Sequence, residues 1–129
     1  ESCGNVWSAH SFAGRQRHIL GEASAKRAPQ ADAVADYVAK HKGQSIILTG
    51  DFNDSPISYA HRRLASELTD CYIASANGPG ISYHYNCFYV RIDNIMCSEH
   101  WTPYECRVDN TIKASDHYPI VCKLSRVEN

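Results

Sequence analysis

The chain passes from an apolar strand to polar side chains at Leu48-Thr49-Gly50-Asp51-Phe52-Asn53-Asp54-Ser55-Pro56. The preceding residues, 45–48, form a short apolar run of the kind that is buried in a sheet. Gly50 lets the backbone turn sharply, so that Asp51 and Asn53 emerge together at the carboxyl tip of the strand. Such a pair can hold a divalent cation or orient a water molecule, and the alternative is an Asx turn that caps the next helix.

Periodicity predicts two helices around this strand. A helix is expected over residues 29–42, and it could start earlier with a kink where Pro29 removes a donor. The second helix is expected to start with Ser55 as N-cap and Pro56 at its first position. Its apolar face would consist of Ile57, Ala60, Leu64 and Leu68.

The remainder of the chain reads as β-structure. Strands are expected near residues 71–73, 81–83, 88–97, 104–108 and 119–124, with a turn at 77–80. No internal repeat or low-complexity linker interrupts the pattern, which indicates a single domain over residues 1–129. The expected fold class is α/β of the α+β type, a mostly antiparallel sheet with helices on one face.

Two further clusters carry acids and an imidazole. Ser115-Asp116-His117-Tyr118-Pro119 stands just before an apolar run, and Arg91-Ile92-Asp93-Asn94-Ile95-Met96 places an acid inside a strand-like segment. A buried Asp is costly unless it is paired. His117 would be a sensible partner for Asp93, because a carboxylate fixes the imidazole tautomer and favours the protonated ring. Alternatively, Asp93 is a structural acid bonded to the backbone.

Taken together, three motifs point to one family. G-D-F-N (residues 50–53), R-I-D-N-I (91–95) and S-D-H-Y-P (115–119) resemble, in this order, the C-terminal half of the endonuclease/exonuclease/phosphatase (DNase I-like) superfamily. The resemblance runs from the helix around residues 27–32 to Leu124, and residues 1–23 stay unplaced. It implies one half of a four-layer α/β sandwich whose active site lies across the top, and a metal-dependent phosphoesterase activity.

The resemblance also implies roles for individual residues. Asp51 would orient and deprotonate the attacking water, and Asn53 would position that water or the scissile phosphate. Asp116 would join Asp51 at a metal site for Mg2+, or for Mn2+ or Ca2+. His117, held by Asp93, would donate hydrogen bonds to a phosphate oxygen as negative charge develops. Phosphodiester hydrolysis requires these parts: an activated water, a Lewis acid and donors aimed at the developing charge.

A loop before the Asp93 strand resembles the family loop that lies beside the phosphate site. On this basis Tyr83, His84 and Arg91 are candidate substrate contacts, and ordinary half-buried β residues are the alternative for the first two. The usual loop glycine has no clear counterpart here. Asn94 stands where the family more commonly has Tyr after the Asp, so the substrate contacts are less well defined than the reaction class.

The family's upstream half carries an Asn and the Glu that is usually the principal metal ligand. Residues 1–7 are too short to supply them, and His10 cannot be equated with the family's histidine-bearing strand. We therefore expect a partial catalytic domain that binds its metal weakly. Its second sheet face would be an exposed apolar surface, covered by the missing half or by a second copy. The competing hypothesis is a non-catalytic fragment or interaction module that engages a partner through this face.

Composition narrows the range of substrate classes but does not identify the substrate. The formal net charge is -1 and no Lys/Arg stripe is visible, which favours a small phosphate ester or a lipid headgroup over nucleic acid. No apolar run reaches the roughly 18 residues of a membrane span. The six cysteines lack the C-x-x-C spacing of structural zinc sites, and the sequence leaves their pairing open.

Overall fold

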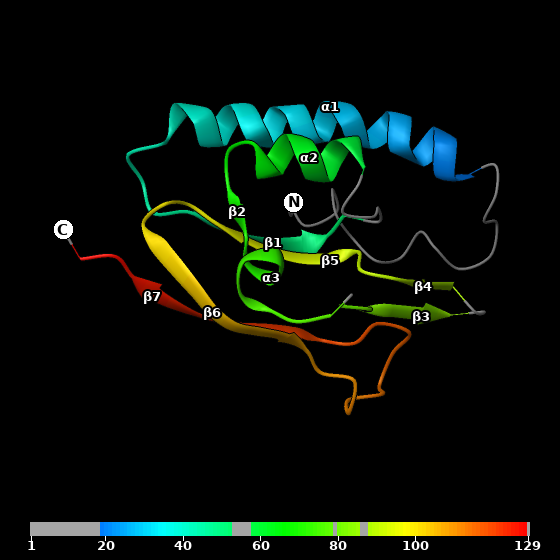
Figure 1. Cartoon of the computed structure of the whole chain (residues 1–129). Coiled ribbons are helices and arrows are strands. Elements are labelled where there is room, and N and C mark those ends of the chain that lie inside the picture. The colour runs from blue at the N-terminus through cyan, green and yellow to red at the C-terminus, as the bar shows by residue number, and fades with distance from the viewer. Residues whose placement is uncertain (1–18, 53–57, 79, 86–87, 129) are drawn as a thin grey trace.

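The structure is a computed structural model that describes residues 19–52, 58–78, 80–85 and 88–128. Two helices, α1 (Ile19–Lys40) and α2 (Tyr59–Ala65), form one layer above the strands (Figure 1). The strands and the short helix α3 (Cys71–Ser75) lie below these two helices. Every strand pair in the described part of the chain is antiparallel, which confirms the expected mixed fold. None of the helices in these ranges has the length and hydropathy needed to span a bilayer.

Helix α1 is longer than periodicity alone predicted. It begins at Ile19, ten residues before Pro29, and it ends at Lys40 rather than at residue 42. Its buried positions Ala31, Ala35 and Val38 recur at helical spacing and face α2 and the sheet. These contacts explain why a proline inside the helix is tolerated: packing, more than local propensity, stabilises a helix of this kind.

Helix α2 begins later than expected. Its N-cap is Ser58, whose hydroxyl accepts a hydrogen bond from the backbone N–H of His61 at 3.2 Å. The predicted cap, Ser55, and the first-turn residue Pro56 lie outside the described residues. Ala60 and Leu64 are buried as predicted, and they join the core beneath the helices.

The central sheet has the order β1-β5-β2, with β5 (Asp93–Cys97) in the middle. Strand β1 (Ile47–Asp51) pairs with β5 so that Leu48 lies opposite Met96 and Asp51 opposite Asp93. Leu48 and Met96 contact the helical layer, where the buried core consists of Ala35, Val38, Phe52, Leu64, Leu68 and Met96. Because side chains alternate along a strand, Asp51 and Asp93 lie on the opposite sheet face, at its end.

Two predictions of strands need correction. Residues 71–73 belong to α3, because Asp70 caps this helix and accepts hydrogen bonds from the N–H groups of Tyr72 and Ile73 at 2.9 and 3.1 Å. Only Thr69–Asp70 forms a strand there, β2. Because the Asp70 side chain satisfies these two N–H groups, the backbone turns into a helix instead of continuing to pair as a strand.

The segment 88–97 is not one strand but two. Strand β4 (Phe88–Val90) pairs with β3 (Tyr83–Tyr85) in a separate hairpin, and β5 starts at Asp93. Between them, the Ser82 hydroxyl accepts hydrogen bonds from the N–H groups of Ile92 and Asp93 at 3.1 and 3.2 Å. One side chain thus satisfies two backbone donors at the junction, where the chain leaves one sheet and enters the other.

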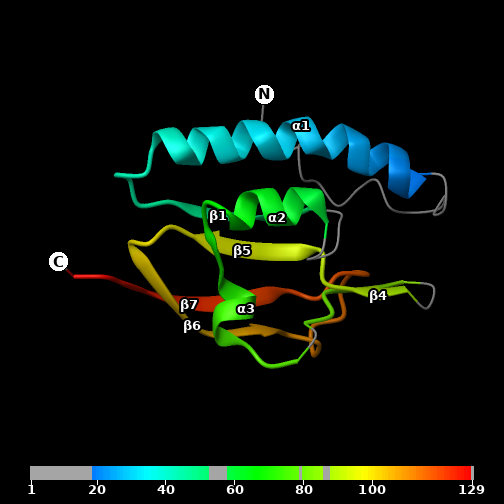
Figure 2. The same ribbon diagram turned by 45° about the horizontal axis from the view of Figure 1, so that its top comes forward.

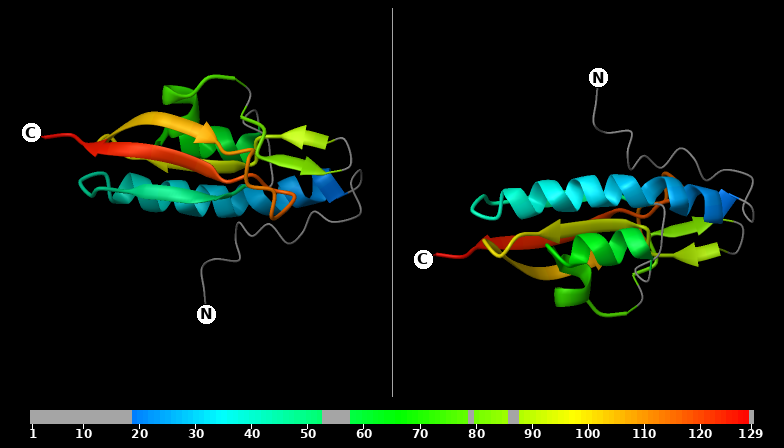
Figure 3. Two further views of the ribbon diagram at one scale, coloured as in Figure 1. Left: turned by 90° about the horizontal axis from the view of Figure 1, so that it is seen from below. Right: turned by 90° about the horizontal axis from the view of Figure 1, so that it is seen from above.

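A two-stranded ribbon completes the fold. Strands β6 (Trp101–Val108) and β7 (Ile120–Arg126) lie alongside β5, on the side away from α1 and α2 (Figure 2). Viewed from above, the two helices lie in front with β5 visible between them, and viewed from below, the ribbon comes forward (Figure 3). A second core beneath β5 joins the ribbon to α3 through Cys71, Tyr72, Cys97 and Cys106.

We expected an exposed apolar surface on the sheet face turned away from the helices, and apolar side chains of β1 and β7 are exposed. Ile47 on β1 is 46% exposed, and Val121 on β7 is 40% exposed. Part of the face that β5 turns away from the helices is already covered by the ribbon, because Ile95 packs in the second core. A missing half or a second copy over the remaining surface stays a prediction.

Candidate active site

Three separate elements bring two acids and an imidazole to one end of the sheet. Asp51 is the last residue of β1, and its register partner Asp93 is the first residue of β5. His117 lies in the connection from β6 to β7, three residues before β7 begins. An isolated β-bridge to Tyr83 fixes the backbone of His117 at this position.

The three side chains form a compact cluster. Nδ1 of His117 donates to Oδ2 of Asp93 at 2.8 Å, as expected from the sequence. Nε2, on the other side of the ring, lies 3.8 Å from Oδ2 of Asp51. One potential ligand atom from each residue lies within 4.8 Å of the other two. The hydrogen bond from Nδ1 therefore orients the ring and directs its second nitrogen toward Asp51.

The surrounding charges favour a protonated imidazole. The hydrogen bond to Asp93 raises the pKa of His117 above its ordinary value, while burial acts in the opposite direction. The negative charges of Asp93, Asp51 and Asp116 raise this pKa further. The ring therefore keeps its proton at a higher pH than a free histidine does, and it can act as a donor.

Apolar walls enclose the cluster on one side. Asp51 is 7% exposed, although the sheet face on which it lies is the one turned away from the helices. The ring of Tyr83, also fully buried, contacts the His117 ring edge-on with 5.1 Å between centroids. Limited access of water strengthens the electrostatic interactions within such a site.

Asp116, the second expected metal ligand, takes another position. Its carboxylate accepts a hydrogen bond from the Ser115 hydroxyl at 3.1 Å, and it is not part of the three-residue cluster. Its backbone carbonyl accepts a hydrogen bond from the N–H of His84 at 3.0 Å. Asp116 thus acts on His117 through its charge and through the loop backbone. Asn53, the other residue of the first motif, lies outside the described residues.

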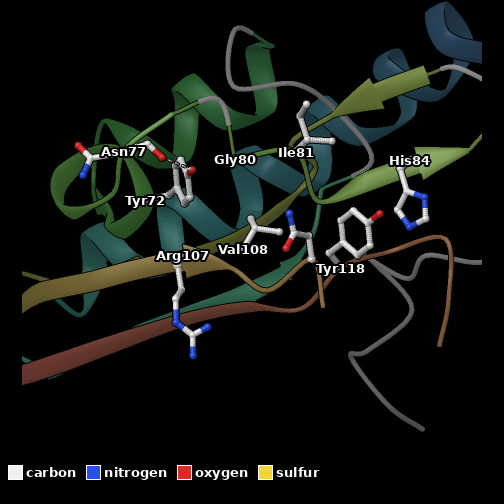
Figure 4. Close-up of a pocket in the computed structure, with 9 residues that line it drawn as sticks. Tyr72, Asn77, Gly80, Ile81, His84, Arg107, Val108 and Tyr118 are labelled. Atoms are coloured by element: carbon white, nitrogen blue, oxygen red, sulfur yellow. Dashed lines mark hydrogen bonds between the residues drawn. The ribbon is translucent and has the colours of Figure 1, made fainter. Parts of the chain in front are cut away.

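Tyr83 and His84, two of the expected substrate contacts, point to opposite faces. Tyr83 packs against His117, whereas the His84 ring stacks on Tyr118 at 3.9 Å. His84 and Tyr118 line a cavity of about 400 Å³ with Tyr72 across from them (Figure 4). The rest of its lining consists of Asn77, Gly80, Ile81, Arg107, Val108 and Asn110. The backbone bridge between Tyr83 and His117 separates this cavity from the acidic cluster.

Arg91, the third expected substrate contact, is held inside the fold. It is 4% exposed, and its guanidinium donates to Asp70 Oδ2 at 2.8 Å and to Asn94 Oδ1 at 2.7 Å. The same Asp70 oxygen accepts a hydrogen bond from Nε2 of His61 at 2.6 Å. These contacts give Arg91 a structural role, and the substrate contact that the motif suggested stays a prediction. Nothing in the local sequence indicates that His61 and Asp70 belong to this network, because the three partners are distant along the chain.

The donor chemistry of the acidic cluster is compatible in part with a divalent cation. Magnesium, manganese and calcium prefer carboxylate oxygens, which Asp51 and Asp93 supply. One oxygen of Asp93, however, is already engaged by His117. The cluster could hold a metal ion, but it provides few oxygen ligands for an ion that prefers six.

The model of the Endonuclease/Exonuclease/phosphatase family matches residues 3–117 of the chain. The chain belongs to this family. The match extends across most of residues 1–23, which the motifs left unplaced, and it includes His10, whose position lies outside the described residues. No curated protein matches the chain.

Solved structures share the fold. A functionally unknown conserved protein from Enterococcus faecalis V583 matches with a TM-score of 0.67 at 16% identity, over 81% of this chain and 46% of that chain. A family protein from Bacteroides thetaiotaomicron matches with a TM-score of 0.60 at 22% identity, over 83% and 45%. A mannosyl-6-phosphatase from Bacteroides thetaiotaomicron VPI-5482 matches with a TM-score of 0.59 at 25% identity, over 84% and 48%. The chain thus spans less than half the length of these structures.

Proposed function

We propose that this chain carries the C-terminal part of the catalytic domain of a metal-dependent phosphoesterase. The observation that supports the proposal is the meeting of Asp51, Asp93 and His117 at one sheet end, in a chain of this family. The Asp93–His117 hydrogen bond is directional, and it leaves Nε2 facing the buried acid Asp51. An arrangement required only for folding would not need a second acid beside the other ring nitrogen.

Each side chain has a proposed chemical task. Asp51 orients the attacking water and accepts its proton, because its carboxylate stands at the sheet end beside the imidazole that would bind the phosphate. Asn53 positions this water or the phosphate. His117, kept protonated by Asp93, donates its Nε2–H to a phosphate oxygen, where negative charge increases during attack. Asp93 touches only the imidazole among these groups and is therefore a positioning residue.

Magnesium is the proposed cofactor, with manganese or calcium as substitutes. The carboxylate of Asp51 would hold it, and Asp116 would contribute through its negative charge or through a bridging water. When bound, the ion supplies Lewis-acid stabilisation of the phosphate. Further ligands would come from the upstream half of the family domain, and so we expect weak metal binding by residues 1–129 alone.

The proposed substrate is a small phosphate monoester. The formal net charge of -1, without a Lys/Arg stripe in the sequence, favours a small substrate over a nucleic acid backbone. The relative at 25% identity acts, by its name, as a mannosyl-6-phosphatase, which supports a phosphorylated sugar as the class to test first. The cavity beside His84 and Tyr118 is lined by aromatic and amide groups that suit a sugar ring, although it opens on the other side of the Tyr83–His117 bridge.

The proposal is tested by phosphate release from mannose 6-phosphate in the presence of Mg2+. The assay compares the chain alone with the chain extended by the family's upstream half, and bis-nitrophenyl phosphate serves as the diester comparison. We expect turnover only from the extended protein, and a loss of about 100-fold or more in Asp51→Asn and in His117→Gln. Glu99→Gln, an exposed change just beyond the other end of β5, is the matched control. Full activity in Asp51→Asn and His117→Gln would refute the assignment.

A further inference from the structure

Four free cysteines gather in and around the core beneath β5, and the chemistry proposed above uses none of them. They are Cys71, Cys97, Cys106 and Cys122. The thiol of Cys71 contacts the thiol of Cys97, with 3.6 Å between the two sulfur atoms. Cys106 and Cys122 lie opposite each other where β6 pairs with β7, and Cys122 packs against the core cluster that contains Cys106. The four residues therefore form two dithiol pairs.

The fold explains how each pair arises. Cys71 is the first residue of α3, and Cys97 is the last residue of β5, where the two elements pack together. Cys106 follows Glu105, a non-glycine residue with a φ of 53°. The pairing of β6 with β7 steps from Tyr104↔Lys123 to Arg107↔Val121, so Glu105 and Cys106 together oppose the single residue Cys122. This bulge places the Cys106 and Cys122 side chains next to each other across the ribbon.

The two pairs differ in access to solvent. Cys71 and Cys97 are fully buried, and Cys106 is 4% exposed, whereas Cys122 is half-buried. Burial raises the pKa of Cys71 and of Cys97, and it raises the pKa of Cys106 to about 12. Because the thiolate is the reactive form of cysteine, the fully buried pair is protected twice, by exclusion and by protonation.

We propose that these pairs are two intramolecular disulfide sites that close in a fixed order. In the folded protein, a small disulfide such as oxidised glutathione reacts first at the accessible Cys122. The sulfur of Cys106 then displaces the glutathione. The pair Cys71–Cys97 closes only while the chain is folding or after the core has opened. The separation of 3.6 Å needs only a small movement of the sulfur atoms to reach bonding distance.

The exchange is balanced for each disulfide. The Cys122 thiolate attacks one sulfur of oxidised glutathione, which breaks its S–S bond and releases one reduced glutathione. The Cys106 thiol loses its proton to water. The resulting thiolate attacks the Cys122 sulfur of the mixed disulfide and releases a second reduced glutathione. The two cysteines are oxidised by two electrons, and the glutathione disulfide is reduced by two.

The two disulfides would connect different pairs of elements. A Cys106–Cys122 bond ties β6 to β7, the strand that begins three residues after His117. A Cys71–Cys97 bond ties α3 to β5, the strand that begins with Asp93. Both would therefore restrict elements that lead to the acidic cluster, and both should raise the thermal midpoint because they constrain the unfolded chain.

The test uses the chain carrying Cys3→Ser and Cys87→Ser, since these two thiols lie outside the described residues. The folded protein is treated with oxidised glutathione, the remaining thiols are alkylated, and the disulfides are located by peptide mass spectrometry. We expect one internal disulfide, Cys106–Cys122, with the mass reduced by two hydrogens. Refolding from denaturant with the same reagent should give Cys71–Cys97 in addition.

Two variants and one rate measurement test the order in which the thiols react. Cys122→Ser should block disulfide formation in the folded protein, whereas Cys71→Ser should leave it unchanged. Alkylation of the native thiols, followed over time without any substitution, should proceed first at Cys122 and last at Cys71 and Cys97. Formation of Cys71–Cys97 first, a bond between members of different pairs, or glutathione that stays on Cys122 without release would each overturn the proposal.

Discussion

At the residue scale, the hydrogen bond between Asp93 and His117 determines the charge of the site. We expect Asp93→Asn to bring the pKa of His117 down toward its ordinary value of 6.5, because the largest cause of the upward shift is removed. An NMR titration of the His117 ring protons measures the change. An identical His117 pKa in both proteins would mean that the pairing has no electrostatic effect.

The same hydrogen bond links stability to pH. The folded-state pKa of His117 is raised, so the folded protein binds this proton more tightly than the unfolded chain does. The associated stabilisation is therefore fully present below the unfolded-state pKa and is lost as the pH rises through the folded-state pKa. In Asp93→Asn this decline should be absent from denaturation curves recorded across that range.

Gly80 is a residue whose replacement should damage the fold directly. Its φ is 64°, and an added Cβ would lie 2.4 Å from a ring carbon of Tyr72 and 2.9 Å from Cδ of Arg91. Backbone strain and overpacking add together, so we expect Gly80→Ala to lower the free energy of unfolding by about 2–4 kcal/mol in urea denaturation. Gly43→Ala is the control, because its Cβ would have nothing within 4 Å. Equal stabilities of the two variants would contradict this description of Gly80.

At the element scale, one buried acid joins α2, α3 and the start of β5. Asp70 caps α3, accepts hydrogen bonds from His61 on α2, and pairs with Arg91 just before β5. Burial alone would raise the pKa of Asp70, but the hydrogen bonds from His61 and Arg91 outweigh it and lower this pKa to about 2. The depressed pKa means that its stabilisation is present above the unfolded value near 4 and is lost as the pH falls toward 2.

Removing this charge should be costly, because Arg91 would remain buried without its partner. We expect Asp70→Asn to reduce the free energy of unfolding at neutral pH by about 3–5 kcal/mol. Asp36→Asn is the matched control: it breaks an exposed pair with Arg63 and should cost about 1 kcal/mol or less. Chemical denaturation at pH 7 compares the two. A cost for Asp70→Asn no larger than that of the control would show that the network does not hold these elements together.

Local sequence patterns predicted the elements better than their junctions. The apolar spacing at Ala31, Ala35 and Val38 and at Ala60 and Leu64 identified both helices and their buried faces. The break before β5 and the short helix α3 were missed, because they depend on hydrogen bonds from Ser82 and Asp70 that become visible only when the chain is folded.

In the candidate site, too, the contacts that depend on the folded chain could not be predicted from local sequence. The pairing of Asp93 with His117 could be anticipated, because a strand acid needs a partner and the motif at residues 115–119 offered an imidazole. The structural use of Arg91 could not, because its partner Asp70 belongs to none of the three motifs. The motifs thus named three side chains that the fold brings together, whereas the assignment of each polar partner required the tertiary structure.

At the scale of the whole molecule, the chain spans less than half of its solved relatives, and its acidic cluster supplies few metal ligands. Magnesium surrenders its water ligands reluctantly and requires six ligands in all. We therefore expect residues 1–129 to bind Mg2+ with a dissociation constant of about 1 mM or weaker. Isothermal titration before and after extension with the upstream half should show tighter binding in the extended protein. Unchanged affinity would indicate that the upstream half adds no ligand.

If Asp51 binds a cation beside the imidazole that Asp93 holds, paramagnetic relaxation by Mn2+ should single out His117 among the histidines. Mn2+ is titrated into the chain while the ring signals of all histidines are recorded. We predict that the His117 signals broaden at the lowest Mn2+ concentration, that Asp51→Asn abolishes this selectivity, and that Glu99→Gln leaves it intact. Uniform broadening of all histidines, or selective broadening of His117 that persists in Asp51→Asn, would contradict the claim.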